Sequence, residues 1–394
     1  MPSVESVRRA IVVVLLGALA AVGMAWWYLP QVKHAERDSP RTSVGYERHG
    51  DRVLRTLPGD TPYARWLNKS RGHLPMFEGL MIPDIGTVAL GPWPQMGANI
   101  TGLYLRFADY QVSDGRIVEI PAGASMAPQR HLFEMGVYFL GGPGHTLFFP
   151  EGGEPLRVDW RAGSVFSVPL NTRYQHFNDS GQAVRVLAIT SFPFALNATN
   201  SESFVFDNEH HFAGRFAGEA DYFQRSEAIG ERRTRTNFVA DAMTVQLGSG
   251  SNRGGGQRTM SWPMAGNSVL DMHVSSIPPQ SHMKAHRHSS DAFLLILSGE
   301  GYSLIWNGDK VEERQRINWR RHTLLVPPTY WYHQHFNAGS VESRHLAINS
   351  PELVKNLGLR FYDQIEDDSR EVRAEWTREM RRRTAPNGIA AGNP

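Results

Sequence analysis

Two stretches of the chain, Pro128–Gly144 (PQRHLFEMGVYFLGGPG) and Ala285–Gly301 (AHRHSSDAFLLILSGEG), are copies of one motif. A second motif follows each copy, as Trp160–Asn178 (WRAGSVFSVPLNTRYQHFN) and Trp319–Asn337 (WRRHTLLVPPTYWYHQHFN), with Trp-Arg starts and Phe-Asn ends in register. The offset between copies is 157 residues in the first motif and 159 in the second, so the loop between them gained two residues, a change that loops accept easily. The repeat predicts two tandem domains of one fold.

Short apolar runs broken by Gly, Pro and Asn surround both motif pairs, from about residue 102 to 189 and again from 269 to 348. Runs of this length and spacing are typical of an all-β barrel or sandwich. The predicted fold is therefore all-β, with barrel 1 over residues 96–195 and barrel 2 over residues 261–352.

The segments around the two barrels have predicted roles of their own. Residues 1–30 are assigned as a membrane anchor or signal, 31–95 as a linker and N-terminal extension, and 196–260 as an interdomain segment. Residues 353–394 are assigned as a C-terminal helix and tail. The helix is expected over Asp367–Arg383, where Glu379 can pair with Arg383 at i+4.

Composition excludes several kinds of chemistry. The 41 Lys and Arg residues balance 39 Asp and Glu residues, so no global charge points to nucleic acid. The chain has no cysteine, which excludes disulfides, zinc–thiolate sites, iron–sulfur clusters and thiol nucleophiles. The 16 histidines leave imidazole as the main nitrogen ligand for a metal.

The N-terminal segment carries a targeting signal. Ala10–Leu29 is 20 residues without a charge, long enough to cross a hydrocarbon core of about 30 Å as a helix. Arg8 and Arg9 precede it, and aromatic residues 26–28 lie at its far end. We expect a single-pass anchor with both barrels extracytoplasmic. The alternative is a signal peptide cleaved near Ala18–Ala20, which leaves a secreted or periplasmic protein.

The histidines of the second copy mark the expected site of chemistry. His286 and His288 are two residues apart, so both side chains project from one face of a strand. His333 lies in a later strand, and the three meet only if both strand faces turn into the barrel. Three imidazoles can hold one divalent metal ion with coordination positions left open, as in catalytic sites. The alternative is that they are ordinary strand histidines.

The first copy has Gln129, His131 and Tyr174 at the corresponding places. Glutamine is a weak neutral ligand, and tyrosine must ionise from a pKa near ~10 to bind a metal well. We therefore predict that barrel 1 binds no metal. Glu134 is the one nearby residue that could supply a further ligand.

Both halves resemble the cupin family, whose six-stranded β-barrel carries a G…HxH…E…G motif and a PxGxxHxxxN motif. HRHSSDAFLLILSGEG matches the first motif, and PPTYWYHQHFN matches the second. The resemblance covers about residues 100–190 and 265–350, which implies a bicupin. Cupin motifs indicate the fold and the metal position, but the fold hosts oxygenases, isomerases, decarboxylases, hydrolases and proteins without catalysis.

One departure from the family pattern narrows the expected reaction. Many cupins place a Glu ligand four or five residues after the second histidine, where this chain has Ala292 and Phe293. Asp291 comes one residue earlier, and a shift of one residue turns a strand side chain to the opposite face. A ligand set of three neutral imidazoles is similar to that of gentisate-type ring-cleaving dioxygenases, whose motifs also have the forms HRHxxSA and WHxHxN.

This resemblance implies a non-haem Fe(2+) dioxygenase that acts with O2 on a hydroxylated aromatic or enolic acid. Mn(2+), Ni(2+) and Zn(2+) stay open as alternatives to iron. The alternative functions are a non-redox metal enzyme (isomerase, lyase or hydrolase) and a non-catalytic cupin that binds a small molecule. The expected partners are a small-molecule substrate and, through the N-terminal helix, a membrane; a homo-oligomer stays open.

His335 is the candidate catalytic residue. It follows the ligand His333 by two residues, and its copy-one counterpart His176 survives where the ligands do not. The survival favours a structural hydrogen bond common to both barrels, and proton transfer is the alternative role.

Further candidates for the pocket wall flank the motifs. We expect the aromatic residues in the core and the polar residues in solvated loops, with contact to a substrate ring and to its carboxylate as the respective alternatives. The candidates are Phe293, Tyr302 and Trp331, and Gln280, Lys284 and Arg287.

Overall fold

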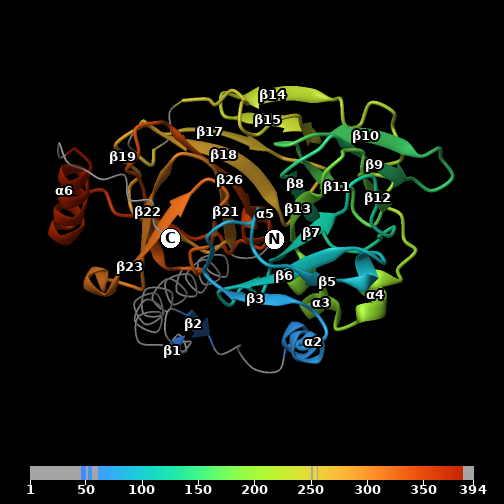
Figure 1. Cartoon of the computed structure of the whole chain (residues 1–394), viewed down its shortest axis with the longest axis horizontal. Coiled ribbons are helices and arrows are strands. Elements are labelled where there is room, and N and C mark those ends of the chain that lie inside the picture. Colours follow the sequence, from blue (N-terminus) through green and yellow to red (C-terminus); the bar gives the residue numbers. More distant parts are fainter. Residues whose placement is uncertain (1–45, 50–51, 56–60, 250–251, 255, 385–394) are drawn as a thin grey trace, which may run out of the picture. The chain divides into compact units, whose positions relative to one another are not determined.

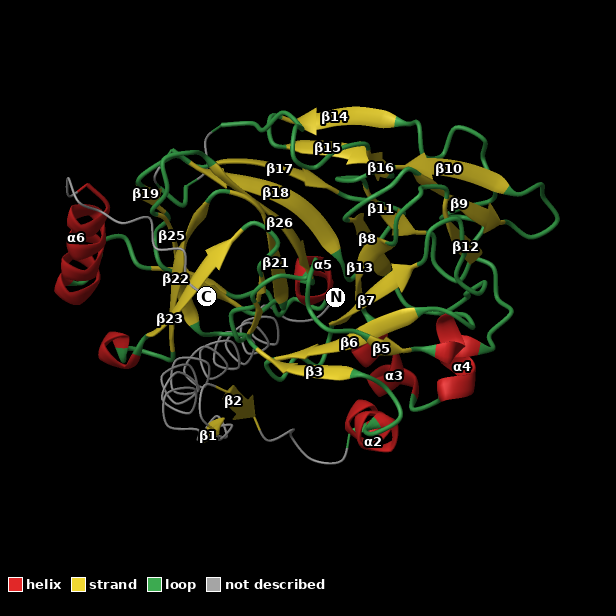
Figure 2. Cartoon of the chain, viewed as in Figure 1, coloured by secondary structure: helices red, strands yellow, loops and turns green. Residues whose placement is uncertain are grey.

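The computed structural model describes residues 46–49, 52–55, 61–249, 252–254 and 256–384. Strands dominate the chain, and the helices are short (Figure 2). The α-helices are α2 (Pro62–Ser70), α3 (Phe192–Thr199), α4 (Glu202–Phe206), α5 (Pro351–Asn356) and α6 (Arg370–Thr384). The 3-10 helices are η1 (Pro94–Met96) and η2 (Val311–Glu313). The predicted all-β class is confirmed.

Barrel 1 is built from an eight-stranded and a three-stranded sheet. The first has the order β16-β11-β8-β13-β7-β6-β3, with β5 also paired to β6, and the second has the order β10-β9-β12. These strands are β3 (Met76–Gly79), β5 (Gly91–Pro92), β6 (Thr101–Phe107), β7 (Asp114–Ile120), β8 (Met135–Phe139), β9 (Gly144–Phe149), β10 (Leu156–Trp160), β11 (Val165–Val168), β12 (Arg173–Asn178), β13 (Val184–Thr190) and β16 (Phe238–Val239).

Barrel 2 is built from an eight-stranded and a six-stranded sheet (Figure 1). The orders are β14-β15-β17-β18-β26-β21-β24-β4 and β23-β22-β25-β20-β27, with β19 also paired to β25. These strands are β4 (Met81–Ile82), β14 (Ser226–Gly230), β15 (Arg233–Thr236), β17 (Arg258–Trp262), β18 (Asp271–Ile277), β19 (Ser281–His282), β20 (His286–His288), β21 (Ala292–Ser298), β22 (Glu300–Trp306), β23 (Gln315–Arg320), β24 (Leu324–Leu325), β25 (Tyr332–Asn337), β26 (Ser343–Asn349) and β27 (Tyr362–Gln364).

A separate pair of strands, β1 (Tyr46–His49) and β2 (Arg52–Arg55), forms a two-stranded sheet. The predicted membrane span lies outside the described residues, and so it stays a prediction. In the part of the chain that the structure describes, no helix has the length and apolar character needed to cross a membrane.

Each barrel gains one short strand from the segment that precedes the other barrel. Strand β4, which comes before barrel 1 in the chain, pairs with β24 of barrel 2. Strand β16, which comes before barrel 2, pairs with β11 of barrel 1. The extension and the interdomain segment, assigned from sequence as linking regions, thus contribute strands to the opposite barrel.

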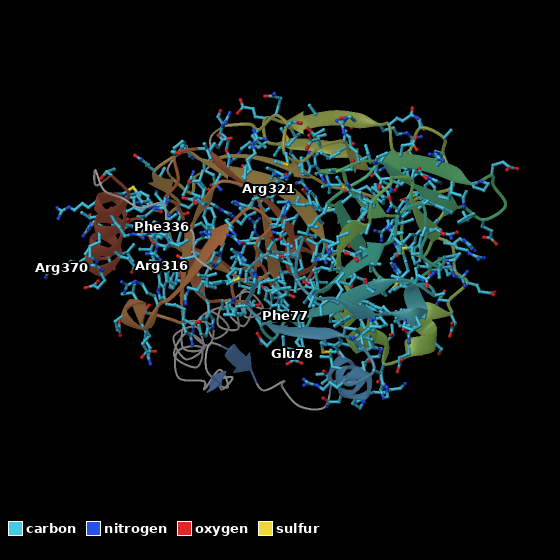
Figure 3. The ribbon with its side chains drawn as sticks, viewed as in Figure 1. Phe77, Glu78, Arg316, Arg321, Phe336 and Arg370 are labelled. Carbon is cyan, nitrogen blue, oxygen red and sulfur yellow. The ribbon has the colours of Figure 1, made fainter. Side chains whose placement is uncertain are left out.

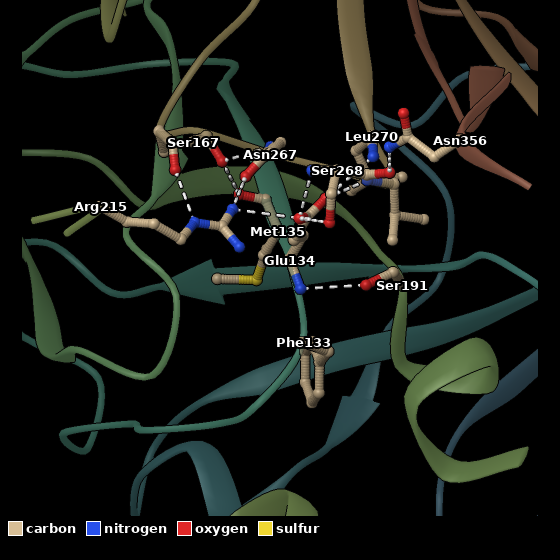
Figure 4. A network of polar contacts seen from close by, with 12 residues as sticks. Phe133, Glu134, Met135, Ser167, Ser191, Arg215, Asn267, Ser268, Leu270 and Asn356 are labelled. Carbon is tan, nitrogen blue, oxygen red and sulfur yellow. Dashed lines mark hydrogen bonds and ion pairs between the residues drawn. The ribbon is translucent and has the colours of Figure 1, made fainter. Parts of the chain in front are cut away.

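One acidic residue from each barrel strengthens this exchange. Glu134 accepts hydrogen bonds from the backbone N–H groups of Ser268, Val269 and Leu270 at 2.7 to 2.9 Å, and Arg215 pairs with it at 3.0 Å (Figure 4). Asp291 of barrel 2 holds the equivalent position in the repeat, and it contacts barrel 1.

Asp291 accepts from the backbone N–H and the hydroxyl of Ser113 in barrel 1, at 3.0 and 2.9 Å. The backbone N–H groups of Glu134 and Asp291 donate to Ser191 and Ser350, each at 3.0 Å. The repeat therefore gives the interface two equivalent halves.

The C-terminal helix is confirmed, because α6 contains the expected pair between Glu379 and Arg383 at 2.7 Å. Trp376 of α6 packs on Phe336 with ring centroids 5.5 Å apart. Phe336 and Arg316 lie on the side of barrel 2 next to α6 (Figure 3). Arg316 of β23 lies over the Tyr302 ring at 3.7 Å and bonds to Glu379 at 3.1 Å. The helix is thus held to the outer side of β22, β23 and β25.

Candidate metal centre

The three histidines predicted as ligands lie together in barrel 2. His286 and His333 are directly paired across β20 and β25, and His288 projects from the same face of β20 as His286. One ring nitrogen from each of the three lies within 4.8 Å of the others. This spacing allows the three nitrogens to bind one ion, as the sequence analysis expected.

Each ligand candidate is oriented by a backbone carbonyl. Nδ1 of His286 bonds to the Lys284 carbonyl at 3.1 Å, Nδ1 of His288 to the Ser290 carbonyl at 2.8 Å, and Nδ1 of His333 to the Trp331 carbonyl at 3.1 Å. A carbonyl only accepts, so Nδ1 carries the proton in all three rings. The lone pair of Nε2 is then available for a metal, which is the usual arrangement of metal-binding histidines.

Burial keeps these rings neutral. It lowers the pKa of His288 to about 4, with the positive charge of Arg253 as the next cause. Burial also lowers the pKa of His286 and of His333 well below the usual value, and neighbouring histidines add to the effect. Since a metal binds the neutral imidazole, no proton competes for these nitrogens near neutral pH.

Asp291 does not join the cluster. Its carboxylate accepts from Ser113 and, at 3.1 Å, from the Thr329 hydroxyl. The following residue, Ala292, is buried and has no ligand atom. The predicted orientation of Asp291, on the face opposite the histidines, agrees with these contacts, and the cluster has three neutral ligands.

The corresponding place in barrel 1 is filled by side chains. Gln129 and Tyr174 are paired by an antiparallel β-bridge, and His286 and His333 are paired in the same way. The register of the repeat therefore extends to the site. His131 bonds to Tyr174 at 3.3 Å and stacks on Phe133 with ring centroids 3.8 Å apart.

Burial raises the pKa of Tyr174 well above its ordinary value, which disfavours the ionised form that a metal needs. Glu134 is committed to the interface with barrel 2. These contacts support the prediction of no metal in barrel 1.

His335 is part of a hydrogen-bonded unit that both barrels share. Its Nδ1 lies 2.7 Å from the Ser303 hydroxyl, which also accepts from the Trp319 indole at 3.1 Å. In barrel 1 His176, Thr146 and Trp160 repeat this unit with the same two distances, 2.7 and 3.1 Å.

His335 therefore makes the structural hydrogen bond that its conservation in both copies predicted. Ser303 is fully buried, and Nδ1 of His335 is the one acceptor among its described side-chain contacts, so the hydroxyl proton is donated to Nδ1. Nε2 of His335 then carries a proton and faces the cavity as a donor.

A cavity surrounds the cluster, with an empty volume of about 660 Å³ that includes its open mouth. Besides the cluster it is lined by His335, by two further histidines, His273 and His345, and by Arg253 and Arg360. None of the described residues that line it is acidic. Sequence reasoning missed His273 and His345, although comparison of the copies would have found them, because Arg116 and Val186 hold those places in barrel 1.

Two of the aromatic candidates for the pocket wall do not reach the cavity. Phe293 packs on Phe107 at 5.7 Å and Tyr302 on Phe336 at 4.6 Å, so neither lines the cavity. Both are core residues because their strand positions face packed neighbours.

The flanking cations are also engaged elsewhere. Lys284 pairs with Glu366, and Arg287 pairs with Asp363 at 2.9 Å. The aromatic rim consists instead of Phe361 and Tyr362, which β27 brings beside β20. No local sequence pattern predicted that C-terminal strand.

The structure is similar to that of a variant of salicylate 1,2-dioxygenase from Pseudoaminobacter salicylatoxidans in complex with gentisate, with a TM-score of 0.53. That match has 11% identity and covers 86% of this chain and 95% of that chain. The chain has a bicupin fold. The predicted resemblance to cupins is thereby confirmed for the fold.

Two other solved structures are similar to this bicupin at a lower level. A variant of oxalate decarboxylase from Bacillus subtilis has a TM-score of 0.47 and 10% identity, over 78% of this chain and 87% of that chain. Vicilin from Corylus avellana (hazelnut) has a TM-score of 0.46 and 9% identity, over 76% and 94% of the two chains. No protein-family model and no curated protein matches the bicupin.

Proposed function

We propose that the bicupin is a non-haem Fe(2+) dioxygenase that holds one ion on His286, His288 and His333 and acts on a hydroxylated aromatic or enolic acid. The observation that carries this proposal is the set of three neutral imidazoles in a cavity whose described lining residues include no acid. When bound, the ion would supply a Lewis-acid centre with open positions for an anionic substrate and O2.

The charge of the cavity supports an acid as the substrate. Arg253 and Arg360 line the cavity, and its described lining residues include no acidic side chain. Because the ligand imidazoles are neutral, they leave the charge of the ion uncompensated as well. A bound carboxylate or enolate would balance this positive charge in a partly desolvated site.

Side chains of the cavity would position such a substrate. The Nε2–H of His335 is placed to donate to a substrate oxygen beside the metal, and Phe361 and Tyr362 offer flat surfaces at the rim. Buried Met283, Ala292 and Ala347 form an apolar part of the wall and limit water there.

The test combines metal analysis with oxygen consumption. Protein purified without oxygen should contain about one ion per chain, and the iron-loaded protein should consume O2 with a hydroxylated aromatic acid. Turnover without O2 consumption would favour an isomerase, lyase or hydrolase that uses another metal, such as Mn(2+). Binding without turnover across the whole panel would favour a non-catalytic cupin. Two ions per chain, one of them lost in H131A, would contradict the assignment of barrel 1 as metal-free.

A further inference from the structure

The cavity extends beyond the ligand cluster to a second group of polar side chains. His273 lies on β18, and His345 and Asn349 lie on the neighbouring strand β26. All three line the cavity, and His345 is only 5% exposed. The ring of His345 is 6.0 Å from that of His335, which is in turn 5.5 Å from the ligand His333. This far-side group therefore lies on the eight-stranded sheet, whereas the metal ligands lie on the six-stranded sheet.

Polar atoms of this group are available for a ligand. The side-chain oxygen of Asn349 is buried without a hydrogen-bond partner in the described structure. A buried acceptor of this kind is costly unless a water or ligand satisfies it. A neutral histidine offers one N–H donor and one acceptor, so His273 and His345 add two of each to the cavity.

Comparison of the barrels separates structural from functional polar groups. His335 and Asn337 have identical counterparts in barrel 1, and both copies make the same contacts. Nδ2 of Asn178 donates to three carbonyls at 2.7 to 3.0 Å, and Nδ2 of Asn337 donates to the three equivalent carbonyls at 2.8 to 3.0 Å. These contacts are thus common to both barrels, and the Nδ1 contact of His335 is independent of any role that its Nε2 has in the cavity.

The far-side group has no such duplicate. Positions 273, 345 and 349 correspond to Arg116, Val186 and Thr190 in barrel 1. Thr190 donates to Asp114 within the barrel 1 core. The set of two histidines and one asparagine occurs only in the barrel that also has the three-imidazole cluster, so the fold does not require these residue types.

We propose that the N–H groups of His273 and His345, with the charge of Arg253, form a second binding subsite for a carboxylate of the substrate, while the Asn349 oxygen, which only accepts, takes a water or a hydroxyl beside it. This inference rests on the proposed function, in which one end of the substrate binds the metal. It adds that the other end of the substrate carries a carboxylate. The substrate is then a two-ended anion, with one oxygen group at the metal and a carboxylate held at the far side of the cavity. Neutral N–H donors and one nearby guanidinium suit a carboxylate in a buried site.

The test measures binding without turnover. The full chain is loaded with Co(2+), and the visible spectrum of the ion is titrated with malonate, succinate and glutarate, and with propionate, butyrate and valerate as the matched monoacids. One diacid should bind at least about tenfold more tightly than its monoacid. Equal binding of diacid and monoacid at every chain length would overturn the proposal.

Variants show which residues cause the tighter binding of the diacid. H345F and H273F should bind the monoacids as the parent does and lose the preference for the diacid. R253Q gives the same test on a less buried residue if the histidine variants do not fold. The control is H210F, which replaces an exposed histidine outside the cavity. A diacid preference that persists in H345F, H273F and R253Q would mean that both carboxylates bind the ion, which contradicts the subsite.

This outcome is separate from the proposed reaction. Absence of O2 consumption contradicts the dioxygenase and leaves the diacid preference unaffected, because the cobalt titration needs no turnover. Loss of the preference contradicts the subsite and leaves the dioxygenase standing.

Discussion

At the scale of single residues, the metal cluster depends on proton placement as much as on position. His286, His288 and His333 each use Nδ1 on a backbone carbonyl, which leaves Nε2 for the ion. His335 has the opposite arrangement, with Nδ1 on a hydroxyl. Four histidines on two strands therefore divide into three ligand candidates and one donor.

Replacing any one of the three by Ala should lower metal content from about one ion per chain to almost none, because two imidazoles hold a divalent ion weakly. The barrel should stay folded, since its core is built from apolar strand residues such as Leu295 and Leu304. Metal analysis and far-UV circular dichroism measure the two effects. H131A in barrel 1 is the control and should retain the metal. Full occupancy in H333A would show that the ligand assignment is wrong.

His335→Ala should keep the metal and lower kcat by about a hundredfold, if the ring moves a proton during the reaction. The Ser303 hydroxyl loses its partner, so a small loss of stability is also expected. His176→Ala removes the same hydrogen bond from barrel 1 and serves as the control, because it should lower stability without lowering kcat. Equal losses of kcat in the two variants would mean that His335 is only structural.

At the scale of elements, the repeat creates an interface in which each barrel supports the other. Strands β4 and β16 cross to the opposite barrel, and Glu134 and Asp291 bind backbone N–H groups beyond the same boundary. Asp291 directly follows Ser290, whose carbonyl orients His288. Barrel 1 therefore reaches the residues beside the metal cluster.

Glu134→Ala should destabilise the protein by about 3 to 5 kcal/mol, because it leaves Arg215 and three backbone N–H groups without their acceptor in a buried place. Urea denaturation measures the change. Glu227→Ala removes an exposed ion pair with Arg235 and should leave the midpoint unchanged. A midpoint for the Glu134 variant equal to that of the Glu227 variant would contradict the role of this carboxylate in docking the barrels.

At the scale of the whole molecule, buried histidines make stability depend on pH. Burial lowers the pKa of His131 and of His176 to about 3, and Arg116 adds to the effect at His131. The unfolded chain binds these protons near pH ~6.5, so between about pH 6.5 and 3 it binds more protons than the native state. Stability should therefore fall as pH falls through this range. Asp114, whose pKa burial raises to about 6, acts in the opposite direction.

His131→Gln removes one such group and should reduce the pH slope of the unfolding free energy by up to about 1.4 kcal/mol per pH unit. Urea midpoints of metal-free parent and variant at pH 7, 6 and 5 give the slopes. H210Q, at an exposed histidine, should show the parent slope. A parent slope in H131Q would mean that His131 is protonated in the native state.

The sequence alone was sufficient for the barrels, the three ligand candidates and the C-terminal ion pair. Strand periodicity and a duplicated motif encode these features locally, because side chains two residues apart share a face and equivalent strands pair in the same register. The shared role of His335 and His176 was also visible, since a residue kept in both copies serves the common fold.

Only the tertiary structure decided the partners of Glu134, the exchange of β4 and β16, and the walls of the cavity. These contacts join residues more than a hundred positions apart, such as Glu134 with Leu270 and Ser113 with Asp291. Phe361 and Tyr362 line the cavity because β27 returns to pair with β20, and His273 and His345 face it because β18 and β26 close the barrel. Local patterns set which face a side chain occupies, whereas closure of the sheets determines what that face meets.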